Sequence, residues 1–259
     1  MNRRNFLFKS AYLAAGSLLG MNSFSKAFAF DGHRGSSFFQ PRIALIIDDI
    51  GYSFARTRRF LELDIPITFS ILPRVTHSQA LAVEIHSYGH EVMLHQPMQP
   101  YNSHLDPGPG ALYEGYDPWK ISSIIEENIS DVPLAIGVNN HMGSRFTECQ
   151  KEINETLKVI KNNDLFFIDS LTSHDSKAYK TARRLHITAG RRNVFLDNSR
   201  NELAILFQLH LLKKYALKYG HAIGIGHPFP ETARAIGYFL RSLKDSDISF
   251  VHISEILYT

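Results

Sequence analysis

Short runs of apolar residues recur along the chain, and a stretch with helical spacing follows most of them. The first run, residues 43–47, is continuously apolar, which is typical of a strand buried on both faces of a parallel sheet. Comparable runs follow at 67–72, 91–94, 134–138, 165–168, 186–189, 221–226 and 248–251. Strands that alternate with helices predict an α/β fold with a parallel sheet. Seven or eight such repeats favour a barrel over an open sheet.

The predicted helices lie between these runs. They are expected at 53–63, 78–88, 117–130, 148–161, 175–185 and 231–243, with a long helix closed by Gly220. Residues 101–116 are rich in Gly, Pro, Asn, Asp and Tyr and form a long loop. Long loops in compact domains are usually binding elements or lids, so this loop is expected to border a ligand site.

Composition excludes several classes of protein. A length of 259 residues suits one large α/β domain. The net charge is +3, and much of the basic excess lies before Asp31, so nucleic-acid binding has no support in the composition. Cys149 is the only cysteine, which excludes an internal disulfide and a thiolate metal cluster.

The N-terminal segment predicts export. Arg3 and Arg4 precede an apolar stretch at 11–21, and Ala27-Phe28-Ala29 resembles a signal-peptidase site, so residues 1–29 are expected to be a signal peptide. The paired arginines resemble the twin-arginine export motif, although Phe8 stands where a lysine is often found.

The apolar stretch is too short to span a bilayer comfortably, and we expect no stable membrane span after cleavage. The alternative is an uncleaved N-terminal anchor, which also places the domain outside the cytoplasm. Residues 30–41 are expected to be a linker and residues 42–259 the functional domain, in a periplasmic or other extracytoplasmic location.

Polar residues gather where the predicted strands end. Asp48 and Asp49 follow the first strand, and the other strand ends carry His95, Asn139-Asn140-His141, Asp169-Ser170 and His227. Because the carboxyl ends of parallel strands share one rim, these side chains are expected to form one site. Both aspartates can reach one pocket only if the chain turns there, which Gly51 permits. Carboxylates with imidazoles are typical ligands of Zn²⁺, with a position open for water.

These strand ends carry a family resemblance. The domain resembles the polysaccharide deacetylases of the NodB homology type, and most closely their divergent polysaccharide deacetylase branch. The matching stretches are residues 46–51 (IIDDIG), 89–98 (GHEVMLHQPM), 137–144 (GVNNHMGS) and 224–228 (GIGHP). The resemblance implies a distorted (β/α)7 barrel and metal-dependent hydrolysis of N-acetyl groups on a glycan.

The resemblance also implies roles for individual residues. Asp48 would be the general base, Asp49 and His95 metal ligands, and His227 the general acid, with Asp169 orienting a neighbour. The family's second histidine is replaced by Gln99, a poor zinc ligand, so His141 is our candidate for the third metal ligand. The family's arginine-proline motif is not recognisable, although an arginine lies close by. The residues expected to contact substrate are Asn140, Ser170, Arg145, Tyr113 and Trp119.

The predicted function is therefore a zinc hydrolase that acts on N-acetyl groups of peptidoglycan or another N-acetylated envelope polysaccharide. The replacement at Gln99 leaves open an alternative, a degenerate barrel that binds glycan or metal without turnover. A glycoside hydrolase using Asp48 and Asp49 is a weaker reading. Adjacent carboxylates cannot easily straddle a glycosidic bond at the required separations of roughly 5–9 Å.

Overall fold

The computed structural model describes residues 40–243 and 246–258. The compact unit to which they belong begins at Gln40. The predicted signal peptide at 1–29 and nearly all of the predicted linker lie outside the described residues, so these domain boundaries stay predictions. None of the helices in the described part of the chain combines the length and apolarity needed to cross a membrane.

The described residues contain one sheet in which every paired strand is parallel to its neighbour. Its strands are β1 (Arg42–Ile50), β2 (Thr68–Ile71), β3 (Glu91–Met98), β4 (Ala135–Met142), β5 (Phe166–Asp169), β6 (Ala189–Arg191), β7 (Val194–Phe195), β8 (His221–Gly226) and β9 (Ser249–Phe250). Their order is β6-β5-β4-β3-β2-β1-β8-β7, and β9 pairs with β1. This order places β1 near the middle of the sheet.

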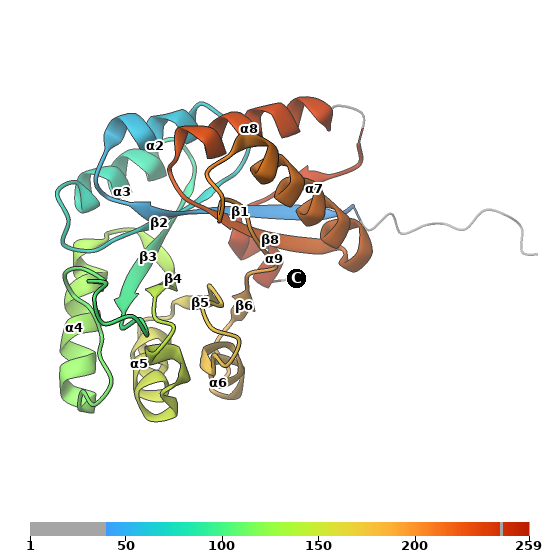
Figure 1. The fold of residues 1–259 in the computed structure, drawn as a ribbon. Coiled ribbons are helices and arrows are strands. Elements are labelled where there is room, and N and C mark those ends of the chain that lie inside the picture. Colours follow the sequence, from blue (N-terminus) through green and yellow to red (C-terminus); the bar gives the residue numbers. More distant parts are fainter. Residues whose placement is uncertain (1–39, 244–245, 259) are drawn as a thin grey trace, which may run out of the picture. The chain divides into compact units, whose positions relative to one another are not determined.

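Helices follow most of the strands and cover the outer side of the curled sheet, with α2, α3, α7 and α8 above it and α4, α5 and α6 below it in Figure 1. They are α2 (Phe54–Leu61), α3 (Ser78–Ser87), α4 (Pro118–Asp131), the 3₁₀ turn η1 (Phe146–Glu148), α5 (Gln150–Asn162), α6 (Ala178–Arg184), α7 (Glu202–Tyr219), α8 (Pro230–Ser242) and α9 (Ile253–Leu257). Side chains of Ser53, Asp117 and Asn201 cap the first turns of α2, α4 and α7.

The strands bury both of their faces in two separate cores. On β1, Ile43, Leu45 and Ile47 belong to the large core under the helices, whereas Ala44 and Ile46 belong to a smaller core inside the curl. Two residues of α9, Ile253 and Ile256, and six further buried residues of the strands and their ends complete this inner core. The period-two alternation of a strand therefore decides which side chains enter the barrel interior.

The predicted α/β barrel is confirmed as a curled parallel sheet. It is not closed: β6 and β7 stand at opposite ends of the strand order. Two predicted strands are longer than expected, since β3 runs to Met98 and β4 to Met142. The short elements β7 and α9 were not predicted, because two strand residues or five helical residues leave too little periodicity to detect.

Candidate active site

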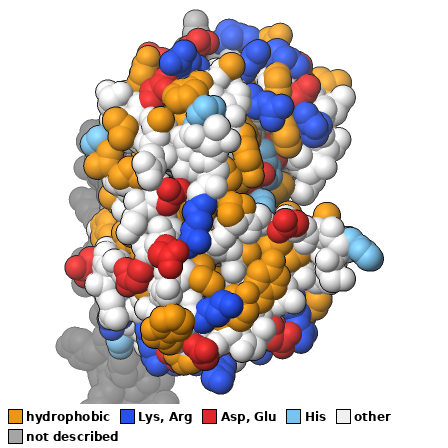
Figure 2. All heavy atoms as spheres, turned by 90° about the vertical axis from the view of Figure 1, so that its left-hand side faces the viewer, with side chains coloured by type: hydrophobic (Ala, Val, Ile, Leu, Met, Phe, Trp, Pro, Cys, Tyr) orange, Lys and Arg blue, Asp and Glu red, His pale blue; other side chains and the backbone are white. Residues whose placement is uncertain are grey.

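The inner rows of the strands end in polar side chains. Each polar residue lies two positions beyond a residue of the inner core: Asp48 after Ile46, His95 after Met93, and His227 after Ile225. The polar cluster is therefore the last layer of the barrel interior. Figure 2 views the molecule from the side toward which β1 points in Figure 1, and histidine side chains are visible there in a recess.

A distortion of β1 brings the second aspartate to the same side as the first. The pairing of β1 with β2 shifts register between Ile47 and Ile50, and Asp49 has a φ of 55°. The bend thus begins at Asp49 itself, two residues before the glycine that we expected to provide it. Gly51 also has a positive φ, 134°, and a Cβ there would lie 2.4 Å from the Val75 side chain. Such strained positions are common at functional sites.

Asp49, His95 and His141 form a nearly equilateral triangle of ligand atoms. Asp49 Oδ1 lies 3.2 Å from His95 Nε2 and 3.0 Å from His141 Nδ1, and the two ring nitrogens are 3.2 Å apart. Tetrahedral Zn²⁺ with bonds of about 2.0–2.1 Å separates its ligands by about 3.3 Å. The triangle therefore has the size of one face of a tetrahedral zinc site.

The surroundings of His95 suit a metal ligand. Its Nδ1 lies 2.6 Å from the side-chain oxygen of Asn139, which can only accept a hydrogen bond. A proton on Nδ1 leaves the Nε2 lone pair facing Asp49 and His141, where lone pairs repel unless a cation or proton lies between them. Such an orienting bond to the second ring nitrogen is typical of metal-binding histidines. The residues present thus fit a divalent metal ion.

Asn139 also links the triangle to Asp48. Its amide nitrogen donates a hydrogen bond of 2.8 Å to Asp48 Oδ1, and the Ser70 hydroxyl donates to its oxygen. All three residues are buried. One amide therefore holds both the predicted base and the predicted ligand His95 in place.

The two aspartates have opposite ionisation tendencies. Burial raises the pKa of Asp48 above its usual range, although His95, His227 and Asn139 partly oppose this. Burial also disfavours the charged form of Asp49, but hydrogen bonds from His141 and His95 outweigh it and hold its pKa far below the usual range. Asp49 is therefore a charged ligand, and Asp48 is the better proton acceptor.

His227 is held by an aspartate that the predicted site did not include. Its Nδ1 lies 2.9 Å from Asp197 Oδ1, and its backbone N–H donates to Asp197 Oδ2 at 2.7 Å. The Nε2 atom faces the site, 3.8 Å from Asp49 Oδ2. Burial disfavours the protonated ring, but Asp197 and Asp49 outweigh that effect and raise the pKa of His227 to about 9. His227 is accordingly cationic at neutral pH.

Other predicted site residues lie outside this cluster. Asn140, on the opposite face of β4 from Asn139, accepts a hydrogen bond from the Ser170 backbone and donates to Met142. Asp169 accepts hydrogen bonds from the backbone N–H groups of Leu171 and Tyr179, and so caps the segment that follows β5.

Four further predicted residues also have other surroundings. The Ser170 hydroxyl is buried and has no hydrogen-bond partner among the described residues, and Arg145 forms an ion pair with Glu114. Tyr113 packs against the ring of Tyr116, and Trp119 is 78% exposed on α4.

Gln99, which replaces the family's second histidine, serves the long loop. Its side-chain oxygen accepts a hydrogen bond from Glu114 N, and its backbone N–H donates to Leu112. The Gln99 side-chain oxygen is thus engaged by a backbone N–H of the loop. Within the described residues, the position of the second histidine is therefore structural.

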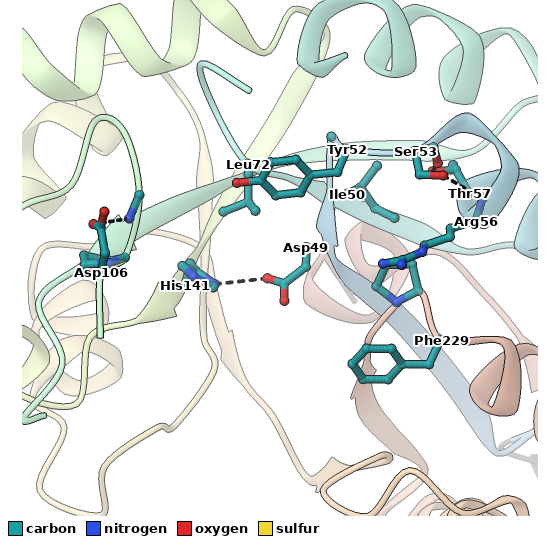
Figure 3. Close-up of a pocket in the computed structure, with 14 residues that line it drawn as sticks. Asp49, Ile50, Tyr52, Ser53, Arg56, Thr57, Leu72, Asp106, His141 and Phe229 are labelled. Carbon is teal, nitrogen blue, oxygen red and sulfur yellow. Dashed lines mark hydrogen bonds and ion pairs between the residues drawn. The ribbon is translucent and has the colours of Figure 1, made fainter. Parts of the chain in front are cut away.

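A cavity of about 240 Å³ opens beside Asp49 and His141. Figure 3 shows Tyr52 and Phe229 on opposite sides of the Asp49 carboxylate, with Arg56 on the side of α2 and Asp106 on the other. Asp106 belongs to the long loop, so the expectation that this loop borders a ligand site agrees with the structure. None of these four residues was predicted.

The strand patterns contained a signal for two of the missed residues. Alternation from His141 places Asn139 on the same face and Asn140 on the other. Asp197 ends an apolar run at 194–196, as Asp48 ends the first strand.

Together, the curled parallel sheet and the acid–histidine cluster at its strand ends define an α/β-barrel protein with a candidate metal site. Residues 45–257 match the family model described as divergent polysaccharide deacetylase. The chain belongs to this divergent polysaccharide deacetylase family.

Three proteins that are similar to this chain are all described as uncharacterized. The uncharacterized protein YibQ of Escherichia coli (strain K12) is 32% identical over 217 residues, which cover 83% of this chain and 67% of that protein. An uncharacterized protein of Haemophilus influenzae is 31% identical over 220 residues, covering 85% and 78%. The crystal structure of an uncharacterized protein from Agrobacterium tumefaciens C58 superposes with a TM-score of 0.79 at 25% identity, covering 84% of this chain and 89% of that one.

Proposed function

We propose that the protein is a metal-dependent hydrolase that removes N-acetyl groups from an envelope or other extracytoplasmic glycan, such as peptidoglycan. The observation that carries the proposal is the triangle of Asp49, His95 and His141 with Asp48 and His227 beside it. Family membership supports the substrate class, and the predicted signal peptide at 1–29 supports export, by the twin-arginine route, to the periplasm or beyond.

Asp49, His95 and His141 would hold the metal ion, for which we propose Zn²⁺. When bound, the ion would polarise the acyl carbonyl and lower the pKa of a water molecule. The triangle leaves one side open toward the cavity, as a catalytic zinc site requires.

Asp48 would take the proton from the attacking water. Its Oδ2 atom is 3.6 Å from His95 Nε2 and therefore borders the triangle, while its Oδ1 atom is fixed by Asn139. Its raised pKa brings proton transfer closer to neutral pH, which favours a general base.

His227 would donate a proton to the leaving amine. Asp197 binds the Nδ1 side of the ring and so directs Nε2 toward the site. Because the pKa of His227 is raised to about 9, the ring is protonated at neutral pH and can transfer its proton to the leaving amine. Acid and base thus approach the triangle from different strands, β8 and β1.

The structure also bears on the alternative of a binding barrel without turnover. That alternative was motivated by Gln99, but His141 can supply the third ligand and Gln99 supports the loop instead. This favours the hydrolase.

Release of acetate from an N-acetylated oligosaccharide tests the proposal. We expect the zinc-loaded protein to release acetate, and Asp48→Asn and His227→Gln to slow release by about 10²–10⁴-fold. The matched control is Asp175→Asn, an exposed acid outside the cluster. No release by the loaded wild type would refute the hydrolase and leave the binding barrel.

A further inference from the structure

The cavity beside the triangle has an unusual distribution of charge. Its wall at the start of α2 carries Arg56, and the loop on the other side carries Asp106. In Figure 3 the Arg56 side chain reaches from α2 toward the Asp49 side of the cavity, and Tyr52 and Phe229 lie above and below. The cavity thus has a cationic wall, a carboxylate on the other side and aromatic rings between them.

Arg56 forms no ion pair with any residue that the structure describes. Three arginines elsewhere in the domain have such partners: Arg58 pairs with Glu84, Arg145 with Glu114, and Arg234 with Glu202. Arg56 is exposed and lines the cavity, so its guanidinium is available to a ligand that enters there.

The position of Arg56 is also unfavourable for helix stability. It stands in the first turn of α2, which contains no acidic residue and whose N-cap is Ser53. The positive end of the helix dipole disfavours a cation in this turn. An anion in the cavity would interact favourably with both the guanidinium and the helix end.

A second guanidinium lies near the cavity without lining it. The Cζ atom of Arg200 lies 4.0 Å from the ring centroid of Phe229, and within the described residues Arg200 has no acidic partner. One arginine, Arg56, therefore lines the cavity, and a second, Arg200, stacks on the ring of a lining residue.

We propose that the substrate is an N-acylated sugar carrying an anionic group, a carboxylate or a phosphate, and that Arg56 binds this group while the acyl group lies at the triangle. The inference rests on the proposed function. Tyr52 and Phe229 offer ring faces for sugar rings, and Asp106 is placed to accept hydrogen bonds from sugar hydroxyls. A guanidinium can bind either anion with two parallel hydrogen bonds.

The test compares oligosaccharides that share N-acetylated sugars and differ only in an added group: none, a carboxylate or a phosphate. Binding to the zinc-loaded protein is measured by calorimetry and acetate release by a coupled assay. We expect the wild type to bind one of the two anionic forms roughly tenfold more tightly than the neutral one, with a preference that shrinks as salt is raised. The anionic form that binds more tightly identifies the group, carboxylate or phosphate, that Arg56 binds.

Substitutions on α2 assign the preference to its residue. Arg56→Gln is expected to reduce the preference for the anionic form toward onefold, whereas Arg56→Lys, which keeps the charge but not the two parallel hydrogen bonds, keeps part of it. The matched control is Arg59→Gln, which removes the same charge from an exposed position of the same helix that does not line the cavity. It should leave the preference unchanged.

The outcomes separate this inference from the proposed function. Acetate release without any preference for anionic substrates, or a preference that survives Arg56→Gln, would overturn the inference and leave the hydrolase intact. Preferential binding of the anionic form without acetate release would support the inference and refute the hydrolase. Failure to bind or cleave any of the three oligosaccharides would refute both.

Discussion

At the scale of single residues, the pair of Asp197 and His227 has the clearest chemical consequence. Asp197 is buried, and its two oxygens accept hydrogen bonds from the His227 backbone, the His227 ring and the Thr232 hydroxyl. These bonds fix the ring in one orientation. They also raise its pKa to about 9, together with the charge of Asp49 and against the effect of burial.

We predict that Asp197→Asn narrows the pH range of acetate release. Loss of the negative charge lowers the pKa of His227, so the protonated acid is lost at a lower pH. The basic limb of the rate–pH profile should therefore move to lower pH by about one unit or more, with a smaller change at acidic pH. The measurement is the pH profile of acetate release.

Asp169→Asn is the matched comparison, because Asp169 is also buried and binds backbone N–H groups outside the cluster. It should reduce stability and leave the basic limb in place. A basic limb that moves in Asp169→Asn but not in Asp197→Asn would contradict this assignment.

The positions of the apolar runs explain which polar residues of the site could be predicted from the sequence. Asp48, Asp49, His95, His141 and His227 stand at strand ends that the apolar runs reveal, and the structure brings these residues together. Asn139 and Asn140 point to opposite faces of β4, and only one face leads into the barrel interior. The sequence does not say which face that is, because both faces of the sheet are covered by apolar side chains.

Cavity-lining residues could not be predicted from local pattern. Tyr52, Asp106 and Phe229 lie in turns and loops, whose paths depend on contacts with distant segments. We expected Tyr113 and Trp119 to contact substrate because they are aromatic and lie in or beside the long loop. Their actual surroundings are a tyrosine ring and open solvent.

At the scale of elements, the end of β1 and the turn into α2 place Asp49. The left-handed backbone at Asp49 and the positive φ of Gly51 turn the chain within three residues, and Ser53 then caps α2. The same short segment thus supplies a ligand of the triangle and the helix that carries Arg56.

We predict that Gly51→Ala destabilises the protein more than Gly89→Ala. Both glycines have positive φ, and an alanine costs roughly 1–2 kcal/mol of backbone strain at Gly89, where φ is 82°, and at least as much at Gly51, where φ is 134° and lies farther from the left-handed helical region. A Cβ at Gly51 would also lie 2.4 Å from Val75, whereas nothing lies within 4 Å of one at Gly89. Overpacking should add about 1–3 kcal/mol at Gly51. Equal losses in the free energy of unfolding, measured by denaturant titration, would show that the clash is relieved at no cost.

At the scale of the whole molecule, the protonation of His90 links stability to pH at a place remote from the strand ends. His90 precedes β3 and is 9% exposed, and its Nδ1 accepts a hydrogen bond from the Ile67 backbone N–H. Burial, with a contribution from His252, lowers its pKa below the usual 6.5. The neutral form is therefore the form that the folded state favours.

We predict that stability is fully present above pH 6.5 and falls as the pH drops below it, because the unfolded chain then takes up a proton that the folded chain resists. His90→Asn keeps an acceptor for Ile67 N–H but cannot titrate. Between pH 7.5 and 5 the wild type should lose about 1 kcal/mol more unfolding free energy than this variant. If the unfolding free energies of the two proteins changed in parallel with pH, His90 would be excluded as the source of the pH dependence.

The family and the barrel could be predicted from the sequence because both depend on repeated features, the apolar runs and their polar ends. The opening between β6 and β7 could not, since those strands have only three and two residues. The predicted signal peptide and twin-arginine route stay predictions, because they concern residues outside the described part of the chain.

The central claim is that Asp49, His95 and His141 hold one metal ion, and elemental analysis after loading with zinc and removal of free metal tests it most directly. We predict about one zinc per chain in the wild type and in Gln99→Ala, and near-complete loss in His141→Ala, with circular dichroism confirming that each variant is folded. A wild type that retains no metal, or zinc that is lost in Gln99→Ala and kept in His141→Ala, would contradict the claim.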